Sequence, residues 1–316
     1  MCAVFGYLDY KRKIENIILK KLIRNLSIAA EVRGTDATGI SYVNHEKVVT
    51  FKKAKPAHKV KLFFPRNTKC VIGHTRMTTQ GSEKYNYNNH PFDGRCGTET
   101  FSIAHNGVLY NDAELKAKYH LPKTQIETDS YVAVQLLEQE KQLHTESIKR
   151  MAESVEGSFV FTILRNDNTL FLVKGNNPLT LYHFPALGLY VYASTKSILD
   201  NALQQVNLSD KCCEIDVSEG EIVEIAANGK RSKTTFAMQN SVFSPYNWDN
   251  LNWYETEEQE ECLLECCRMF GVPEEDVYLL LDYGFSADEI EEMLMNTNLL
   301  EDALAEISVL EQEDAE

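Results

Sequence analysis

The sequence predicts an α+β protein in which two antiparallel β-sheets stack face to face, with helices on their outer faces. Two observations predict this fold class. Short stretches rich in β-branched and aromatic residues follow one another across connections of hairpin length, which join antiparallel strands, and only a few helical segments separate them. The sequence also lacks both a GxGxxG motif and a GxxxxGKS/T phosphate loop, so a doubly wound parallel sheet is not expected.

The chain opens with a strand that leads into a helix. Between Ile14 and Glu31 the apolar residues recur at the spacing of a helix that packs one face on a sheet. The two glycines of segment 33–39 predict a tight turn before the next strand. The other elements expected before residue 110 are strands at 40–43, 47–51, 70–76 and 101–104, a short helix at 57–64 and a long polar loop at 77–97. Long loops in compact domains often bind a ligand, and binding is favoured here.

The second half of the chain alternates helices and strands. Thr128-Asp129-Ser130 can cap a following helix, and a carboxylate at a helix start would be a purely structural use of Asp129. Helices are expected at 112–119, 131–141 and 196–204, and strands at 157–164, 170–173, 188–193, 212–217 and 220–226, the last two as a pair.

The composition is that of a globular protein: 43% of the 316 residues are hydrophobic. No run of about 18 apolar residues could cross a membrane, and the N-terminus lacks the apolar core of a signal peptide, so a cytoplasmic protein is expected. The eight cysteines form no CxxC pair and no Cys/His set with zinc spacing. They are expected to be reduced thiols, and neither a metal nor a cofactor is proposed.

The net charge of −15 is concentrated near the C-terminus. Residues 254–316 contain 21 Asp and Glu residues and one basic residue, Arg268, whereas the rest of the chain contains 26 acidic and 31 basic residues. This shift, with the turn-forming composition of 239–247, predicts a domain at 2–240, a linker at 241–260 and an acidic helical bundle at 261–316. An acidic surface favours a basic protein partner and repels nucleic acid.

The acidic segment shows helical apolar spacing in three stretches, 276–283, 286–295 and 299–308. Gly284-Phe285 lies at the first turn between them. A small three-helix bundle is expected, and its Gly-Phe turn resembles that of ubiquitin-associated domains. We interpret it as a partner-docking module, while a solvated charge run is the alternative for its last ten residues.

Cys2 is a candidate nucleophile because it follows the initiator methionine directly. Removal of Met1 would leave a thiol and a free α-amine on one residue. A thiol titrates near 8.5 and an α-amine near 7.7–8.0, so the amine can accept the thiol proton, directly or through one water molecule, near neutral pH. A chance cysteine at the terminus is the alternative.

Polar residues at the ends of predicted strands supply what an amide substrate would need. Asn106-Gly107 offers a side-chain amide beside a backbone N–H, a compact set of donors for the oxyanion of a tetrahedral intermediate. An amino-acid substrate also needs a cation for its carboxylate and an anion for its ammonium group. Arg76 and Asp129 fit these two needs.

Six motifs, in this order, resemble the class II glutamine amidotransferase family of N-terminal nucleophile hydrolases. They cover most of residues 2–226, and their agreement in order makes a chance resemblance implausible. The motifs are Met1-Cys2-Ala3-Val4-Phe5-Gly6, Arg33-Gly34-Thr35-Asp36-Ala37-Thr38-Gly39, Gly73-His74-Thr75-Arg76 with Thr79 and Gly81, Asn89-His90-Pro91-Phe92, His105-Asn106-Gly107 and Glu127-Thr128-Asp129-Ser130.

The resemblance implies a four-layer αββα sandwich that hydrolyses glutamine to glutamate and ammonia through a γ-glutamyl thioester on Cys2. It implies an oxyanion hole at Asn106 and Gly107, and a grip on the substrate's α-carboxylate and α-amine by Arg76 and Asp129. The remaining implied roles are a pocket or gating loop lined by Thr79 and His90, support of the site by Arg33, and structural roles for His74 and His105.

Two departures from the family pattern concern the surroundings of these groups. Ala3 follows Cys2 where the family usually has glycine, which puts the local backbone in question. Thr78-Thr79-Gln80 replaces a commoner Ala-Thr-His, which affects the loop expected to close over glutamine. Neither change removes a catalytic group.

Members of this family usually carry a synthase domain that consumes the ammonia, and the segment after residue 254 is too short for one. A separate partner synthase, docked in part by the acidic bundle, is therefore expected. Two alternatives remain open. One is a γ-glutamyl amide hydrolase with a substrate other than glutamine, and the other is a regulatory or binding protein that has kept the fold without turnover.

Overall fold

The structure, a computed structural model, describes residues 2–206, 208 and 211–238 and part of the C-terminal region. In that region the described residues are 263, 264, 267, 268, 271–283, 285, 290, 293, 294, 299, 300, 303–305 and 307. Contacts divide the chain into two compact units, Met1–Ser241 and Val242–Glu316. The linker expected at 241–260 lies outside the described residues.

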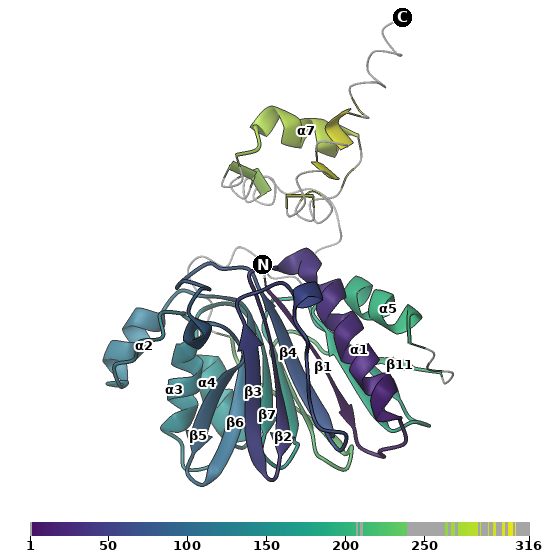
Figure 1. The fold of residues 1–316 in the computed structure, drawn as a ribbon. Coiled ribbons are helices and arrows are strands. Elements are labelled where there is room, and N and C mark those ends of the chain that lie inside the picture. The colour runs from purple at the N-terminus through teal and green to yellow at the C-terminus, as the bar shows by residue number, and fades with distance from the viewer. Residues whose placement is uncertain are drawn as a thin grey trace, which may run out of the picture. The chain divides into compact units, whose positions relative to one another are not determined.

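The first unit contains two antiparallel sheets that face each other between layers of helices (Figure 1). The seven-stranded sheet has the order β11-β9-β10-β1-β4-β2-β3, and the six-stranded sheet has the order β13-β12-β8-β7-β6-β5. In chain order the strands are β1 Ala3–Asp9, β2 Ala37–Asn44, β3 Lys47–Lys53, β4 Cys70–Arg76, β5 Phe92–Cys96, β6 Glu99–Leu109, β7 Gly157–Arg165, β8 Leu170–Lys174, β9 Thr180–Phe184, β10 Leu189–Ala193, β11 Cys213–Ile215, β12 Glu221–Ile225 and β13 Arg231–Thr235. The predicted four-layer αββα sandwich is confirmed.

Helices cover the outer face of each sheet (Figure 1). The seven-stranded sheet carries α1 (Asn16–Ala29) and α5 (Lys196–Gln204), which pack on each other, on β1 and on β10. The six-stranded sheet carries α2 (Asp112–Lys118), α3 (Tyr131–Glu138) and α4 (Thr145–Ser154), with α3 over β5 and α4 against β12.

Strand β1 shows why both of its faces must be apolar. Every residue from Ala3 to Asp9 is buried. Because side chains alternate along a strand, Phe5 and Tyr7 pack with α1 and α5, whereas Val4 and Leu8 pack between the two sheets. The strand that carries Cys2 at its start is therefore held by the core on both sides.

Some expected elements have other bounds. The segment 57–64, expected to be a helix, contains only the 3₁₀ turn η2 (Ala57–Lys59). From Val60 to Phe64 the burial of the side chains alternates, as in an extended chain. The loop expected at 77–97 contains a further 3₁₀ turn, η3 (Asn86–Asn88), and ends in β5, whose residues alternate between buried and exposed. β6 is longer than expected, so the motif 105–107 lies inside a strand.

The last strands pair differently from the expected hairpin. β11 pairs with β9, which was not expected, and β12 lies between β8 and an unexpected β13. The helix α4 was also not anticipated. His144 caps this helix and forms a reciprocal capping box with Ser147. The usual sequence signature of a capping box has Ser or Thr first and Glu or Gln three residues later, so this pair does not match it.

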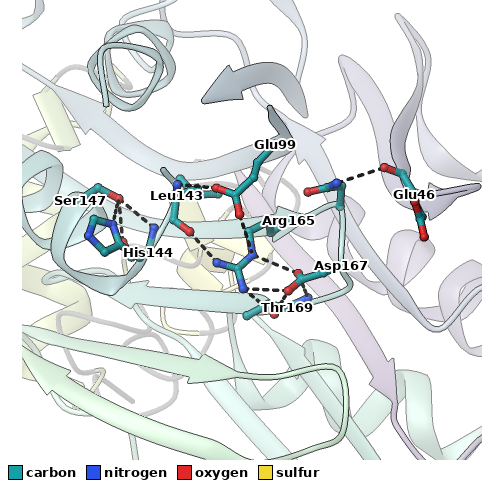
Figure 2. A network of polar contacts seen from close by, with 9 residues as sticks. Glu46, Glu99, Leu143, His144, Ser147, Arg165, Asp167 and Thr169 are labelled. Atoms are coloured by element: carbon teal, nitrogen blue, oxygen red, sulfur yellow. Dashed lines mark hydrogen bonds and ion pairs between the residues drawn. The ribbon is translucent and has the colours of Figure 1, made fainter. Parts of the chain in front are cut away.

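A polar network around Arg165 ties three layers together (Figure 2). The Arg165 guanidinium donates to Asp167 through Nε (3.1 Å) and Nη2 (2.8 Å), and through Nη1 to the carbonyl of Leu143 at 2.6 Å. The next residue, Asn166, donates from Nδ2 to the carbonyl of Glu46 at 3.1 Å. The β7–β8 turn is thus joined to the connection before α4 and to the β2–β3 hairpin.

The second unit contains α7 (Glu274–Asp282), which agrees with the helix expected at 276–283. Three acidic residues in its first turn are favoured there by the helix dipole. Much of the stretches 286–295 and 299–308, and Gly284, lie outside the described residues. The buried apolar residues of this unit are Leu263, Leu264, Cys267, Val272, Val277, Leu280, Ile290, Leu294, Leu300 and Ile307.

Six cysteines in the described parts of the chain are free thiols: Cys2, Cys70, Cys96, Cys212, Cys213 and Cys267. Cys262 and Cys266 lie outside those parts. Within the same residues, none of the helices combines the length and apolarity needed to cross a bilayer.

Candidate active site

Cys2 lies at the end of the seven-stranded sheet where β1 begins and β4 ends. Antiparallel pairing sets Ala3 opposite Thr75, so Cys2 is level with the last residues of β4. The Cys2 thiol donates to the carbonyl of Met77 with an Sγ–O distance of 3.4 Å. Arg33 Nε donates to the Cys2 carbonyl at 3.0 Å. The candidate nucleophile is thereby fixed by its side chain and by its backbone.

The Cys2 thiol has a protonated resting state. Burial raises its pKa, and the negative charge of Asp129 acts in the same direction, while the positive charge of Arg76 opposes them. A thiol with a raised pKa carries little thiolate at neutral pH. It can react as a nucleophile only if a base removes its proton as the reaction begins.

Arg76, the last residue of β4, is an enclosed cation. It is 2% exposed, and burial lowers the pKa of its guanidinium. Its Nη1 donates to Asn89 Oδ1 at 2.6 Å, and its Nη2 donates to the carbonyls of Gln80 (2.6 Å) and Gly81 (3.0 Å). The carbonyl and amide oxygens fix the direction of the guanidinium without neutralising its charge, so an anion can still bind it.

Asn106 and Gly107 lie in β6, on the sheet that faces Cys2's sheet. The Asn106 side chain is fully buried, and both its Oδ1 and its Nδ2 have no hydrogen-bond partner. Gly107 has φ 139°, and a Cβ there would lie 1.9 Å from the carbonyl oxygen of Ser158. Position 107 therefore requires glycine. A buried amide without partners is costly, so this one is a candidate for contact with a ligand.

Asp129 lies just before α3 (Tyr131–Glu138), but no side-chain capping bond is formed at the start of that helix. Its Oδ2 accepts from the backbone N–H of Leu109 at 2.7 Å, and Ser130 Oγ donates to its Oδ1 at 3.4 Å. The carboxylate is almost completely buried and acts electrostatically on Cys2, Arg76 and His105. It is therefore the acidic member of the same charged set.

Comparisons with known proteins agree with this geometry. Residues 74–201 match the model of the glutamine amidotransferase domain family. Glutamine–fructose-6-phosphate aminotransferase (isomerizing) of Bacillus subtilis strain 168 is 32% identical over 188 residues, which are 57% of this chain and 30% of that protein. The cysteine directly before β1 and the four-layer αββα sandwich agree with the class II glutamine amidotransferases that the sequence resembles. Residues 74–201 thus belong to a glutamine amidotransferase domain.

Two further proteins are similar over a longer part of the chain. The 7-cyano-7-deazaguanine synthase 2 of Sulfurisphaera tokodaii is 29% identical over 246 residues, which are 74% of this chain and 52% of that protein. The structure of glutamine phosphoribosylpyrophosphate amidotransferase from B. subtilis superposes with a TM-score of 0.58 at 21% identity, covering 75% of this chain and 50% of that chain. The chain spans about half or less of the length of these relatives.

Three buried histidines lie close together, and two of them are near Arg76 or Asn106 in the sequence. The rings of His74 and His90 lie 4.3 Å apart, and those of His90 and His105 lie 6.3 Å apart, between ring centroids. His74 Nε2 donates to the His105 carbonyl at 2.9 Å, and His105 Nδ1 bonds Ser130 Oγ at 2.7 Å. Burial lowers the pKa of all three, that of His74 to about 3, so they are neutral.

The loop between β4 and β5 is tied to the segment that carries Asp129. Gln80 Nε2 donates to the Glu127 carbonyl at 2.9 Å, and Asn88 Nδ2 donates to Glu127 Oε2 at 2.8 Å. Thr128 Oγ1 donates to the Asn88 carbonyl at 2.9 Å. Thr79, between these contacts, is exposed. Gln80, at the position of a family departure, thus holds the loop through a backbone carbonyl.

The glycines of segment 33–39 have another role than the expected turn. Gly34 has an extended φ of 171°, and Gly39 lies inside β2. A Cβ at Gly34 would lie 2.4 Å from the carbonyl carbon of Arg76, and one at Gly39 would lie 2.2 Å from the carbonyl oxygen of His90. Both positions need glycine because other backbone segments of the site press against them.

Three polar residues of this region had no role assigned from the sequence. Asp36 Oδ2 accepts from the N–H of Thr78 at 2.7 Å, and Asn89 holds Arg76. Both lie inside the recognised motifs, which could have indicated them. Lys52, on β3, also contacts this loop, but a lysine on an edge strand normally indicates a solvated surface. Within the described residues, no cluster of potential ligands could hold a metal ion.

Proposed function

We propose that this chain hydrolyses glutamine to glutamate and ammonia, with Cys2 as the nucleophile after removal of Met1. The observation that carries the proposal is the buried Asn106 amide, which has no partner and lies beside the obligatory glycine at 107. Its strand, β6, packs on β1, the strand that Cys2 precedes. An unsatisfied donor beside a backbone N–H is the arrangement that stabilises a developing oxyanion.

In the first step the free α-amine of Cys2 accepts the Sγ proton, directly or through one water molecule, and Sγ attacks the side-chain amide carbon of glutamine. The raised pKa of the thiol makes this base necessary. The carbonyl oxygen becomes an oxyanion, which accepts hydrogen bonds from Asn106 Nδ2 and the N–H of Gly107.

In the second step the C–N bond breaks, and the α-ammonium group returns its proton to the leaving nitrogen. Ammonia and a γ-glutamyl thioester result. The α-amine then takes a proton from a water molecule, whose oxygen attacks the thioester carbon. The C–S bond breaks, the sulfur regains the proton, and glutamate leaves.

The charged groups of the site suit the two ends of a free amino acid. Arg76 binds the α-carboxylate and Asp129 binds the α-ammonium group, while Thr79 and His90 line the pocket. Three of the five Arg76 N–H groups donate to described residues, which leaves donors for the substrate. Arg33 supports Cys2 through its carbonyl, and His74 and His105 are structural.

The ammonia is used by a separate synthase, and the acidic C-terminal unit contributes to docking it. The relatives carry the names of a synthase and an aminotransferase. The 21 acidic residues of 254–316 favour a basic surface on the partner. Pull-downs with the full chain and with a chain that lacks 254–316 check this docking. Recovery of the same proteins by both would overturn it.

The experiment that tests the activity combines mass spectrometry of the N-terminus with assays of ammonia release. We expect Met1 to be absent, glutamine to be hydrolysed, and Cys2 to be labelled by diazo-oxo-norleucine. Cys2→Ala should abolish turnover and labelling. Faster release from other γ-glutamyl amides would indicate an amidase of another substrate. Neither turnover nor labelling, with any of these substrates, would indicate a binding protein.

A further inference from the structure

Lys52 lies on the edge strand β3, and its ammonium group contacts the loop between β4 and β5, residues 77–91, which we call the active-site loop. Its Nζ donates to the carbonyl of Asn89 at 2.6 Å and to the carbonyl of Pro91 at 3.0 Å. Nζ also lies 4.8 Å from the centroid of the Phe92 ring. Three contacts within the segment 89–92 are more than a solvated surface lysine makes, and two of them are charge-assisted hydrogen bonds.

The segment that Lys52 holds in turn holds the guanidinium of Arg76. Asn89 Oδ1 accepts from Arg76 Nη1 at 2.6 Å, and Asn89 Nδ2 donates to the Glu83 carbonyl at 2.7 Å. The backbone of Asn89 is fixed by Lys52 and its side chain is fixed by Glu83. The position of the Arg76 guanidinium therefore depends on the position of the Asn89 backbone.

The segment lies directly against strands β2 and β3. A Cβ at Gly39 would be 2.2 Å from the carbonyl oxygen of His90, 2.8 Å from Cδ of Pro91 and 2.9 Å from Cβ of Lys52. Lys52 is thus next to the closest contact between loop and sheet. The ammonium group of Lys52 bonds the loop to β3, and the missing side chain of Gly39 lets the loop approach β2.

Two charged residues of neighbouring strands act on the ammonium group of Lys52. Asp93, on β5, favours the ammonium form, and Arg76, on β4, disfavours it; the histidines at 74 and 90 are neutral. Burial is the largest effect and lowers the pKa of Lys52 to about 8. The positive charge that strengthens these two hydrogen bonds is therefore lost in a pH range where the protein can still be assayed.

We propose that Lys52 is a positioning residue for substrate binding, which acts through Asn89 on the carboxylate-binding Arg76. The inference rests on the proposed hydrolysis of glutamine and on the role of Arg76 in it. Lys52 touches neither the substrate nor Cys2. Its loss should weaken substrate binding and leave the chemistry at the thiol unchanged, because the oxyanion donors belong to another strand, β6.

The test compares Lys52→Met, Lys52→Arg and the control Lys53→Met in the full chain. Lys53 is exposed on the same strand, where its Nζ lies 5.9 Å from the centroid of the Phe51 ring. We expect Lys52→Met to raise KM for glutamine about tenfold or more, as misplaced binding groups do, with kcat within about twofold. Lys52→Arg should recover most of the affinity, and Lys53→Met should match the wild type.

Two further readouts separate positioning from a general loss of structure. Alkylation of Cys2 by iodoacetamide, which has neither an α-carboxylate nor an α-amine, should keep the wild-type rate in Lys52→Met. KM of the wild type should rise as the pH increases through about 8, where Lys52 loses its proton, and should stay level in Lys52→Arg over that range. Thermal unfolding of each variant verifies the fold.

The outcomes distinguish the inference from the proposed function. Turnover by the wild type with an unchanged KM in Lys52→Met overturns the inference alone. Equal loss of kcat and of iodoacetamide reactivity in Lys52→Met, or the same pH dependence of KM in Lys52→Arg and the wild type, also overturns it. Absence of turnover in the processed wild type would overturn the proposed function and the inference with it.

Discussion

The carbonyl oxygen of His90 occupies the space where any side chain at Gly39 would begin. A Cβ at position 39 would lie 2.2 Å from that oxygen, which is far inside van der Waals contact. The active-site loop can therefore pack against β2 only because residue 39 has no side chain. The relationship joins the second recognised motif, 33–39, to the fourth, 89–92, and gives a physical reason for the last glycine of the former.

Replacement of Gly39 by alanine should damage the site more than the fold. Since the strand can keep its hydrogen bonds, we expect the loop at 89–91 to be displaced, with a rise in KM for glutamine of about tenfold or more and a loss of about 1–3 kcal/mol in unfolding free energy, the usual cost of overpacking. Steady-state kinetics and urea unfolding measure the two effects. Wild-type KM in this variant would contradict the proposed fit.

The histidines at 74 and 90 should make the domain sensitive to mild acid. Their folded pKa values are lowered by burial, that of His74 to about 3, while an unfolded chain binds protons on them below about pH 6.5. Their contribution to stability is therefore complete above that pH and is lost as the pH falls. The expected slope is about 1.4 kcal/mol per pH unit for each histidine.

Urea unfolding between pH 7 and 5 measures that slope above most of the carboxylate range. His74→Gln keeps a donor for the His105 carbonyl and should reduce the slope by about one proton. His120→Gln, at an exposed position, is the control and should leave it unchanged. An identical slope in His74→Gln and the wild type would show that this residue is protonated as easily in the folded state.

The sequence was sufficient to predict the sandwich because its signals are local. Alternating or continuous apolar runs marked most of the strands, and the spacing around Leu22 and Leu26 marked α1. It missed β5, β9, β13 and α4. The three strands have only five residues each, so an alternating pattern gives little signal, and α4 begins with a His–Ser capping pair instead of a usual signature. The single turn at 57–59 was extended to a helix since helical and extended burial patterns are hard to distinguish over eight residues.

The candidate site divides in the same way. Cys2, Arg76, Asn106 and Asp129 could be named because their chemistry suits an amide substrate and because they lie in recognisable motifs. The role of Lys52 could not be found, because it depends on which backbone carbonyls lie above an edge strand. The glycines of 33–39 were assigned to a turn because the sequence does not show which distant backbone segment packs against them.

The Arg165 network predicts a stability effect that is separate from the site. Arg165 is 18% exposed and bonds both Asp167 and the Leu143 carbonyl, so Arg165→Ala should lower the free energy of unfolding by about 2 kcal/mol. Arg150, 54% exposed in its pair with Glu140, is the control, and its loss should cost less than about 1 kcal/mol. Chemical denaturation compares them. Equal effects of the two substitutions would assign no special weight to the network.

Asn106 provides the most direct test of the chemistry. Its amide has no partner in the described structure, so a smaller side chain removes an interaction that exists only with a ligand. Asn106→Ala should therefore lower kcat by about 10²–10³-fold, the usual effect of losing one oxyanion donor, with little change in KM. The control is Asn177→Ala, which removes the donor to the Asn106 carbonyl, 2.9 Å away, and should have a much smaller effect. If Asn106→Ala raises KM and leaves kcat unchanged, its amide binds the ground state of the substrate and the oxyanion must be stabilised elsewhere.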